Sequence, residues 1–399
     1  MNLDVLISQN ARALGRAYTP KSALLEAIRE FPYRGFVEVA VTGSQPLIMF
    51  SNYDDIVAQH FLFHGPDSFE SYSLMLWAHF AARANVVFDV GAFTGVYSLV
   101  AARSSPSARI LAFEPSLNTF ARLVTNVLAN DLGERIGTLK VALGDADGAL
   151  TLKHPAGIHC LGSQESLVDG RHESIWFEEE VRVFAGDRLG DHYQANPRDF
   201  IIEVDPTRVD LIKIDVEGFE PQVLQGMRDL VARDRPVLLI ECLGVEEFER
   251  VRTLLAPLGY QYRFIDDAAH ELHDDIQRFS RDPLNVLFVN QDLDLEQLSV
   301  NPGQHDRPQA GDMTPERMEA ALRERDDALT ALAKERERNN TLRLHLDQLG
   351  EPEPPHYPLE ADPNSPPLRY VVADEINNRL KKTLKPLHNG LKRLFSTLG

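Results

Sequence analysis

The stretch Val86-Val87-Phe88-Asp89-Val90-Gly91-Ala92-Phe93-Thr94-Gly95 decides the fold. Its first five residues form a short, nearly continuous apolar run, which is typical of a buried strand in a parallel sheet. The two glycines that follow predict a tight loop leading into a helix over residues 96–103. Because this order of elements brings bare backbone close to a ligand, we expect a cofactor-binding loop formed by Asp89, Gly91, Ala92, Phe93 and Gly95.

Strand-like and helix-like segments alternate on both sides of this loop. The predicted strands are 86–90, 109–113, 138–143, 210–215, 236–241, 260–265 and 285–289. The predicted helices are 96–103, 116–130, 220–232 and 245–256. This alternation predicts an α/β fold whose sheet is mostly parallel, carries helices on both faces and ends in an antiparallel strand pair.

The rest of the chain divides around this core. Residues 1–84 predict an N-terminal segment packed on the core, with a helix at 20–30, a hairpin at 35–50 and a helix at 69–84. The core covers residues 85–300. It contains an insertion at about 148–206, with strand-like runs at 151–153 and 181–183, which we expect to cap the active site.

The composition changes again after residue 301. Residues 301–350 predict a polar linker followed by a charged helix. This helix is either a self-associating coiled coil or a single solvated helix. Residues 351–399 predict a proline-rich linker and a basic amphipathic tail. A solvated terminal helix is favoured for this tail over peripheral contact with a membrane.

Charge and composition exclude several classes of protein. The chain has 399 residues and a net charge of −19, which argues against nucleic-acid binding because phosphate recognition needs a basic face. No run reaches the ~18 apolar residues of a membrane span, and the first residues do not resemble a secretory signal. The two cysteines cannot form a disulfide framework. We therefore expect a cytoplasmic protein.

The loop residues discriminate between two kinds of cofactor. A dinucleotide needs Gly-x-Gly-x-x-Gly, and Phe93 occupies the place of the second glycine. The pattern suits instead a phosphate-free cofactor with an amino-acid end, whose ammonium Asp89 can attract. Glu114 ends the second strand about 20 residues later, where a carboxylate can accept both hydroxyls of a ribose. Asp145, at the end of the third strand, is placed near an adenine amino group, although a turn role is also open.

The fourth strand contains the most distinctive run, Asp210-Leu211-Ile212-Lys213-Ile214-Asp215-Val216-Glu217-Gly218-Phe219-Glu220. A lysine on a central strand is costly unless it is paired, and Asp215 lies two positions further on the same face. Ligands bind at the carboxyl ends of such strands. We therefore expect Lys213, Asp215 and Glu217 to lie where the chemistry occurs.

This run resembles the FkbM-type methyltransferases, together with Val87-Phe88-Asp89-Val90-Gly91-Ala92, Ala112-Phe113-Glu114-Pro115 and Val223-Leu224-Gln225-Gly226. The resemblance covers residues 69–289 and implies a Rossmann-like class I methyltransferase sheet that binds S-adenosylmethionine. It also implies methylation of a hydroxyl oxygen on a sugar, glycan or secondary metabolite. The family usually has Asn where this chain has Phe93.

A hydroxyl acceptor benefits from a base, because an alcohol is a poor nucleophile at neutral pH. We expect Asp215 or Glu217 to serve as this base or to orient the acceptor, with Lys213 fixing the carboxylate. A network that only holds the strand end is the alternative. No ligand cluster demands a metal, although Asp215 and Glu241 could bridge a divalent ion. The competing functions are an NAD-dependent oxidoreductase and a non-catalytic scaffold with a helical interaction tail.

Overall fold

The computed structural model describes residues 10, 12–13, 30–52, 54–155, 175–195, 208–275 and 284–290. The helix predicted at 20–30, the linkers, the charged helix and the basic tail lie outside these residues. In the described chain, no helix is both long enough and apolar enough to span a membrane.

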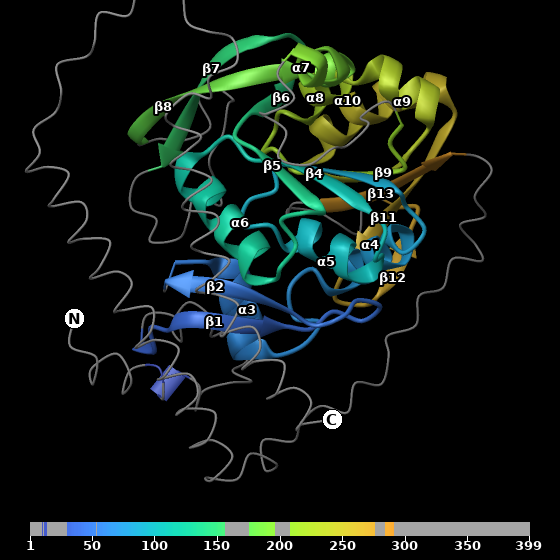
Figure 1. The fold of residues 1–399 in the computed structure, drawn as a ribbon. Helices are drawn as coiled ribbons and strands as arrows, with labels where there is room; N and C mark the ends of the chain where they lie inside the picture. The colour runs from blue at the N-terminus through green and yellow to red at the C-terminus, as the bar shows by residue number, and fades with distance from the viewer. Residues whose placement is uncertain are drawn as a thin grey trace, which may run out of the picture. The chain divides into compact units, whose positions relative to one another are not determined.

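The main sheet has eight strands in the order β12-β11-β13-β10-β9-β3-β4-β5 (Figure 1). In that order the strands are β12 (Glu271–His273), β11 (Tyr260–Asp266), β13 (Leu284–Asn290), β10 (Val237–Cys242), β9 (Leu211–Ile214), β3 (Val86–Val90), β4 (Arg109–Phe113) and β5 (Ile136–Leu139). The strands from β5 to β10 run parallel, whereas β13 is antiparallel to both β10 and β11. The predicted α/β fold, with its antiparallel final pair, is therefore confirmed.

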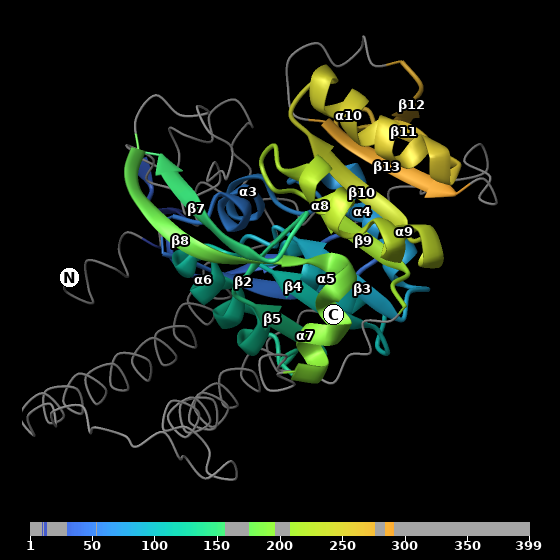
Figure 2. The same cartoon turned by 90° about the horizontal axis from the view of Figure 1, so that it is seen from above.

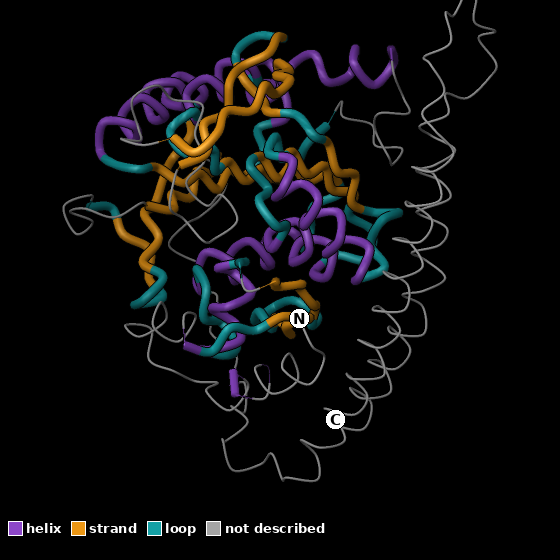
Figure 3. The backbone as a smooth tube through the Cα atoms, turned by 90° about the vertical axis from the view of Figure 1, so that its left-hand side faces the viewer, coloured by secondary structure: helices purple, strands orange, loops and turns teal. Residues whose placement is uncertain are grey.

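Helices cover both faces of this sheet (Figure 3). One face carries α4 (Ser71–Ala81), α5 (Val96–Ser104) and α6 (Leu117–Ala129), and the other carries α8 (Glu220–Gly226), α9 (Arg228–Asp234) and α10 (Val245–Leu255). Each face has its own apolar cluster: Leu99 and Leu123 belong to the first, and Val223 and Phe248 to the second. The sequences of the central strands are almost entirely apolar because these strands are buried on both faces.

Two predicted elements are divided in the structure. The strand expected at 138–143 is split, because β6 (Ala142–Gly144) leaves the main sheet and pairs with β8 (Ile175–Ala185). The helix expected at 220–232 is interrupted at Met227, whose φ of −113° and ψ of 17° are not helical. Gly226 lies against the end of β6 there, since a Cβ on it would be 1.8 Å from the Gly144 carbonyl oxygen.

The described part of the insertion is a second sheet. β7 (Gly148–Pro155) pairs antiparallel with β8, and β6 joins the other edge of β8. This confirms the strand-like runs at 151–153 and 181–183. Figure 2 shows β7 and β8 curving together beside the main sheet, and α7 (Leu189–Ala195) follows β8.

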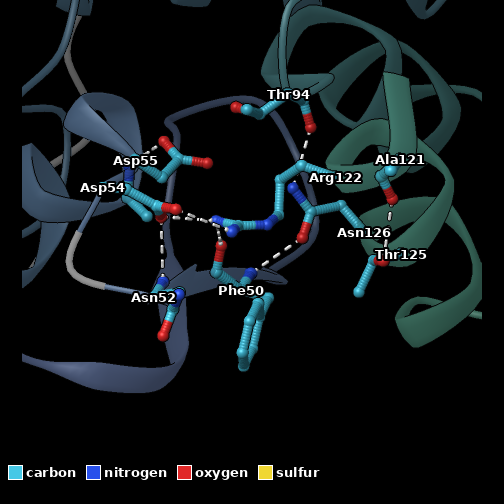
Figure 4. Close-up of polar contacts among 10 residues, drawn as sticks. Phe50, Asn52, Asp54, Asp55, Thr94, Ala121, Arg122, Thr125 and Asn126 are labelled. Carbon is cyan, nitrogen blue, oxygen red and sulfur yellow. Dashed lines mark hydrogen bonds and ion pairs between the residues drawn. The ribbon is translucent and has the colours of Figure 1, made fainter. Parts of the chain in front are cut away.

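The N-terminal segment contains the predicted hairpin and one helix that was not expected. β1 (Arg34–Val39) and β2 (Leu47–Asn52) pair antiparallel, and α3 (Ile56–His64) follows. The free edge of β2 is bound by side chains of α6 (Figure 4). The Phe50 N–H donates to Asn126 Oδ1 at 2.7 Å, and the Phe50 carbonyl accepts from Arg122 Nη1 at 2.9 Å. Asn126 Nδ2 also donates to the Thr94 carbonyl at 2.8 Å, so one amide joins the hairpin to the glycine loop.

Substitution Asn126→Ala is therefore expected to destabilise the protein. Asn126 is fully buried, and its removal leaves the Phe50 N–H and the Thr94 carbonyl without partners. Such losses cost about 1–3 kcal/mol of the free energy of unfolding, measured by urea titration. The matched control is Thr125→Ala on the exposed face of the same helix, which should change stability by less than about 0.5 kcal/mol. Equal stabilities of the two variants would contradict the proposed link.

Candidate active site

A cavity opens at the carboxyl ends of the central strands. β3 lies between β4 and β9, so the chain first builds the sheet to one side of β3 and later returns to build the other. Open α/β sheets bind ligands at such a switch point. Of the predicted site residues, the cavity lining contains Asp89, Gly91, Ala92, Phe93, Glu114, Lys213, Asp215 and Glu217.

The glycine loop is packed tightly against the end of β9. Gly91 has a φ of +79°, and a Cβ at this position would lie 1.8 Å from the Asp215 carbonyl oxygen. Gly95 does not line the cavity. It begins α5 with a φ of +97°, and a Cβ there would meet Leu123 Cδ1 at 2.5 Å. Both glycines are therefore required by the local backbone geometry and by close neighbours.

Four backbone N–H groups of the loop donate hydrogen bonds to other groups of the protein. The N–H groups of Gly91 and Ala92 both donate to the Phe113 carbonyl, at 3.0 and 2.9 Å. The Phe93 N–H donates to Glu114 Oε2 at 2.9 Å, and the Gly95 N–H donates to the Ala92 carbonyl at 2.8 Å. These four amides are therefore already satisfied within the protein. Gly91, Ala92 and Phe93 can shape the wall of the cavity, but their N–H groups do not serve as donors to a ligand.

Glu114 holds the loop from the neighbouring strand. Besides the Phe93 N–H, its carboxylate accepts from the Ser116 N–H and from Thr119 Oγ1, each at 2.9 Å. Phe93 has a φ of +51°, a region that bulky residues rarely adopt and that asparagine adopts more readily. Its partly buried side chain packs against the apolar cluster on the face of the sheet that carries α4, α5 and α6. Glu114 is thus fixed in orientation at the edge of the cavity.

Lys213 is buried in the middle of the sheet with 1% of its side chain exposed. Its register partner on β3 is Asp89. Its Nζ lies 3.2 Å from Asp215 Oδ2, 3.3 Å from Asn285 Oδ1 and 5.1 Å from the centre of the Tyr97 ring. A buried ammonium needs such partners, because its desolvation costs several kcal/mol. The predicted pairing of Lys213 with Asp215 is present in the structure.

Three of the carboxyl groups near Lys213 bind protons more tightly than exposed ones do. Burial raises the pKa of Glu70 to about 7 and that of Asp89 to about 6, while the charge of Lys213 opposes both shifts. Burial, and then the charge of Asp215, raises the pKa of Glu241 well above its usual range. Burial alone would lower the pKa of Lys213, but the surrounding carboxylates raise it. One cation faces four carboxyl groups, and a second positive charge arriving there would favour the charged forms of those carboxyl groups.

Two of these carboxyl groups come from elements other than β9. Glu70 precedes α4 and accepts hydrogen bonds from the Tyr97 hydroxyl at 2.5 Å and from Asn285 Nδ2 at 2.9 Å, both at Oε2. Glu241 lies near the end of β10, the strand next to β9, and lines the cavity. Glu70, Tyr97 and Asn285 were not predicted as site residues. One indication of them was present in the sequence: a lysine on a buried strand needs more than one polar partner.

The loop after β9 is held by a buried acid. Glu217 lines the cavity and has a φ of +58°. Glu220 Oε1 accepts from the Val216 and Gly218 N–H groups, at 2.9 and 3.3 Å, so it fixes the backbone on both sides of Glu217. Burial, and then the neighbouring Glu247, raises the pKa of Glu220 well above its usual range.

Other predicted residues lie elsewhere. Asp145 is exposed and is not part of the cavity lining, which agrees with the turn alternative rather than with an adenine contact. His154 of β7 is buried at 4% exposure beside Glu179. His159 and His172, two further histidines of the insertion, lie outside the described residues. Among the residues that the structure does describe, no group of three or more His, Cys, Asp or Glu side chains could hold a metal ion.

Substitution Gly91→Ala is expected to damage the site and the fold together. The new methyl group would require a φ near +79° and would overlap the Asp215 carbonyl, so the free energy of unfolding should fall by more than about 1 kcal/mol. The control is Gly148→Ala in β7, where a Cβ meets nothing within 4 Å. Thermal unfolding of both variants measures the difference. A Gly91→Ala protein as stable as the control would contradict the close approach.

Comparison with known proteins agrees with this architecture. Residues 89–262 match the methyltransferase FkbM domain. Methyltransferase sdnD of Sordaria araneosa is 31% identical over 162 residues, which are 35% of this chain and 60% of that protein. Methyltransferase 1 of Beauveria bassiana is 30% identical over 184 residues, 44% of this chain and 71% of that protein. Hexuronic acid methyltransferase AglP of Haloferax volcanii is 25% identical over 166 residues, 42% of this chain and 59% of that protein.

Among solved structures, methyltransferase FkbM from Methylobacillus flagellatus is similar at 19% identity and a TM-score of 0.32, covering 51% of this chain and 43% of that one.

The chain spans about 60% of the length of the Sordaria and Haloferax relatives. Together with the domain match, the Beauveria relative, of which the chain covers more than two thirds, establishes the family. The chain belongs to the FkbM methyltransferase family.

Proposed function

We propose that this protein transfers a methyl group from S-adenosylmethionine to a hydroxyl oxygen of a sugar, glycan or secondary metabolite. The observation that carries the proposal is the glycine loop. Its four internally bonded amides leave no cradle of donors for a pyrophosphate, which a dinucleotide would need. The neighbouring excess of carboxyl groups favours a cofactor with positive charge. This disfavours the NAD-dependent alternative.

The residues fit the proposed cofactor along the edge of the sheet. Gly91 lines the cavity and lets the loop pack directly against the backbone of Asp215, because any Cβ there would collide with it. We assign Glu114 to the ribose hydroxyls and Asp89 to the amino-acid end, with Ala92 and Phe93 as loop contacts. Asp89 Oδ2 accepts from Ser98 Oγ at 2.6 Å, which fixes this carboxyl group at the start of α5.

The bound cofactor supplies an activated methyl group, so the protein must align the acceptor and remove its proton. Asp215 is suited to this task because its side chain is 27% exposed and lines the cavity. Lys213, almost fully buried, holds Asp215 Oδ2 from behind. We assign Asp215 as the base or the orienting group for the hydroxyl, with Glu217 beside it on the same loop. A network that only holds the strand end is the competing assignment.

The acceptor class rests on the relatives. The Haloferax protein is named a hexuronic acid methyltransferase, which supports a sugar hydroxyl as the acceptor here. We further propose that residues 1–84 and the insertion at about 148–206 belong to the catalytic unit. Ile56, Val57, Phe69 and Glu70 of the first segment and Leu152 of the second line the cavity, which supports this division. Oligomerisation or peripheral membrane contact through residues 301–399 stays a prediction.

The cofactor assignment predicts that the protein binds S-adenosylmethionine and not NAD. Isothermal titration calorimetry with each compound measures this directly. Incubating the protein and isotope-labelled cofactor with a glycan pool, followed by mass spectrometry, should then reveal an acceptor that gains one methyl group. Binding of NAD without binding of S-adenosylmethionine would overturn the proposed function. If the protein binds the cofactor but methylates nothing in this pool of acceptors, the result would favour the alternative function, a non-catalytic scaffold.

The role of Asp215 predicts the behaviour of Asp215→Asn with that acceptor. The amide cannot take a proton, so kcat should fall roughly 100-fold or more, while cofactor affinity changes little. Asp191→Asn is the matched control, because Asp191 is 73% exposed on α7, away from the cavity. Full turnover by Asp215→Asn would exclude Asp215 as the base and leave the structural network as its role.

A further inference from the structure

Glu70 occupies an unusual position for a residue that begins a helix. Its φ of +39° and ψ of 50° are left-handed, and its side chain makes no capping bond to α4. Asp267, in the turn after β11, caps the helix instead: its Oδ1 accepts from the Ser73 N–H at 2.8 Å, and its Oδ2 accepts from Ser73 Oγ at 2.9 Å. The Glu70 carboxyl group is therefore free of the usual capping role and is directed to the cavity.

Only one of the two Glu70 oxygens is used by the protein. The Tyr97 hydroxyl and Asn285 Nδ2 both donate to Oε2, and Oε1 accepts no hydrogen bond from any described residue. The donors come from α5 and β13, so the carboxyl group is oriented from two sides. An oriented carboxyl group that lines a cavity with a free oxygen is suited to bind a donor with positive charge.

The sheet order places Glu70 opposite Glu114. Glu114 follows β4, on one side of β3, whereas Glu70 is bound to Asn285 of β13, on the far side of β9 and β10. A ligand whose ribose lies at Glu114 extends across the end of β3, so its other end lies toward Glu70 and Lys213. In the proposed cofactor, that other end carries an amino acid.

Resting on the proposed function, we infer that Glu70 binds the ammonium of the cofactor's amino-acid end and releases a proton as the ammonium binds. The pair then forms as a carboxylate with an ammonium, and the proton passes to solvent. This adds a binding residue outside residues 89–262, the part of the chain that matches the family domain.

The titration of Glu70 has a defined direction. Its pKa is raised to about 7 by burial. The charge of Lys213 and the Tyr97 hydroxyl lower this pKa, and the charges of Asp215 and Asp267 raise it. An arriving ammonium favours the charged carboxylate and lowers the pKa, so binding near pH 7 releases a proton. Affinity therefore weakens as the pH falls below about 7, because the carboxyl group of the free protein must first lose its proton.

Calorimetry of the full chain with three probes tests the inference. S-adenosylmethionine and S-adenosylhomocysteine both carry the ammonium, and 5′-methylthioadenosine lacks the amino-acid end. Titrations between about pH 5.5 and about pH 8.5, in buffers of different ionisation enthalpy, count the protons released. We expect proton release near pH 7 with the first two probes and none with the third.

Glu70→Gln keeps the size of the side chain but cannot carry charge. We expect it to weaken both amino-acid-containing probes about tenfold or more and to leave the affinity for 5′-methylthioadenosine unchanged. The pH dependence near 7 should disappear, leaving a weaker one near 6 from Asp89. Unchanged affinity and proton release, or an equal loss for all three probes, would overturn the inference.

Tyr97→Phe provides a second variant that keeps the ring beside Lys213. It removes the hydroxyl that lowers the pKa of Glu70, so the midpoint of proton release should move to higher pH while both cofactor probes still bind. An unmoved midpoint would contradict the role of Glu70 even if Glu70→Gln fails to fold. If the wild-type protein binds none of the probes, the cofactor assignment itself is wrong, and the inference falls with it.

Discussion

A single buried cation, the ammonium of Lys213, organises the centre of this protein. Lys213 lies on β9 between β10 and β3 and is shielded from solvent, so its ammonium needs carboxyl partners from the surrounding elements. Asp215 comes from the same strand end, Glu241 from β10 and Glu70 from the start of α4. Removing any of these elements would leave the ammonium with fewer partners, so the charge balance couples the site to the folding of the whole core.

This coupling explains why the N-terminal segment belongs to the site. It precedes residues 89–262, which match the family domain, yet it supplies Glu70 and part of the cavity wall. Side chains of α6 bind the hairpin edge, and Asp267 fixes the start of α4. The hairpin, the glycine loop and the sheet edge thus form one hydrogen-bonded unit, in which a shift of the hairpin would reach the loop through Asn126.

Sequence patterns predicted the parts of this structure that depend on neighbours in the chain. The apolar strand 86–90, the glycine loop and the pair Lys213 and Asp215, two positions apart on one strand face, are all local features. The contacts of Glu70 were not predictable, because periodicity does not report which distant segment packs against a strand end. The same holds for His154, whose burial beside Glu179 depends on how β7 and β8 pair. Asp145 shows the converse, since a strand-end acid can equally serve a turn.

The hydrogen bonds of the loop backbone distinguish this site from a phosphate-binding site on the same kind of fold. A loop that binds phosphate presents free N–H groups, whereas here the amides of Gly91, Ala92 and Phe93 are satisfied within the protein. The charged side chains that line the cavity are mostly carboxyl groups, among them those of Glu70 and Glu114. Acceptors recognise hydroxyl and ammonium donors and repel phosphate. The internal bonding of the loop backbone therefore supports the proposal of a cationic, phosphate-free cofactor.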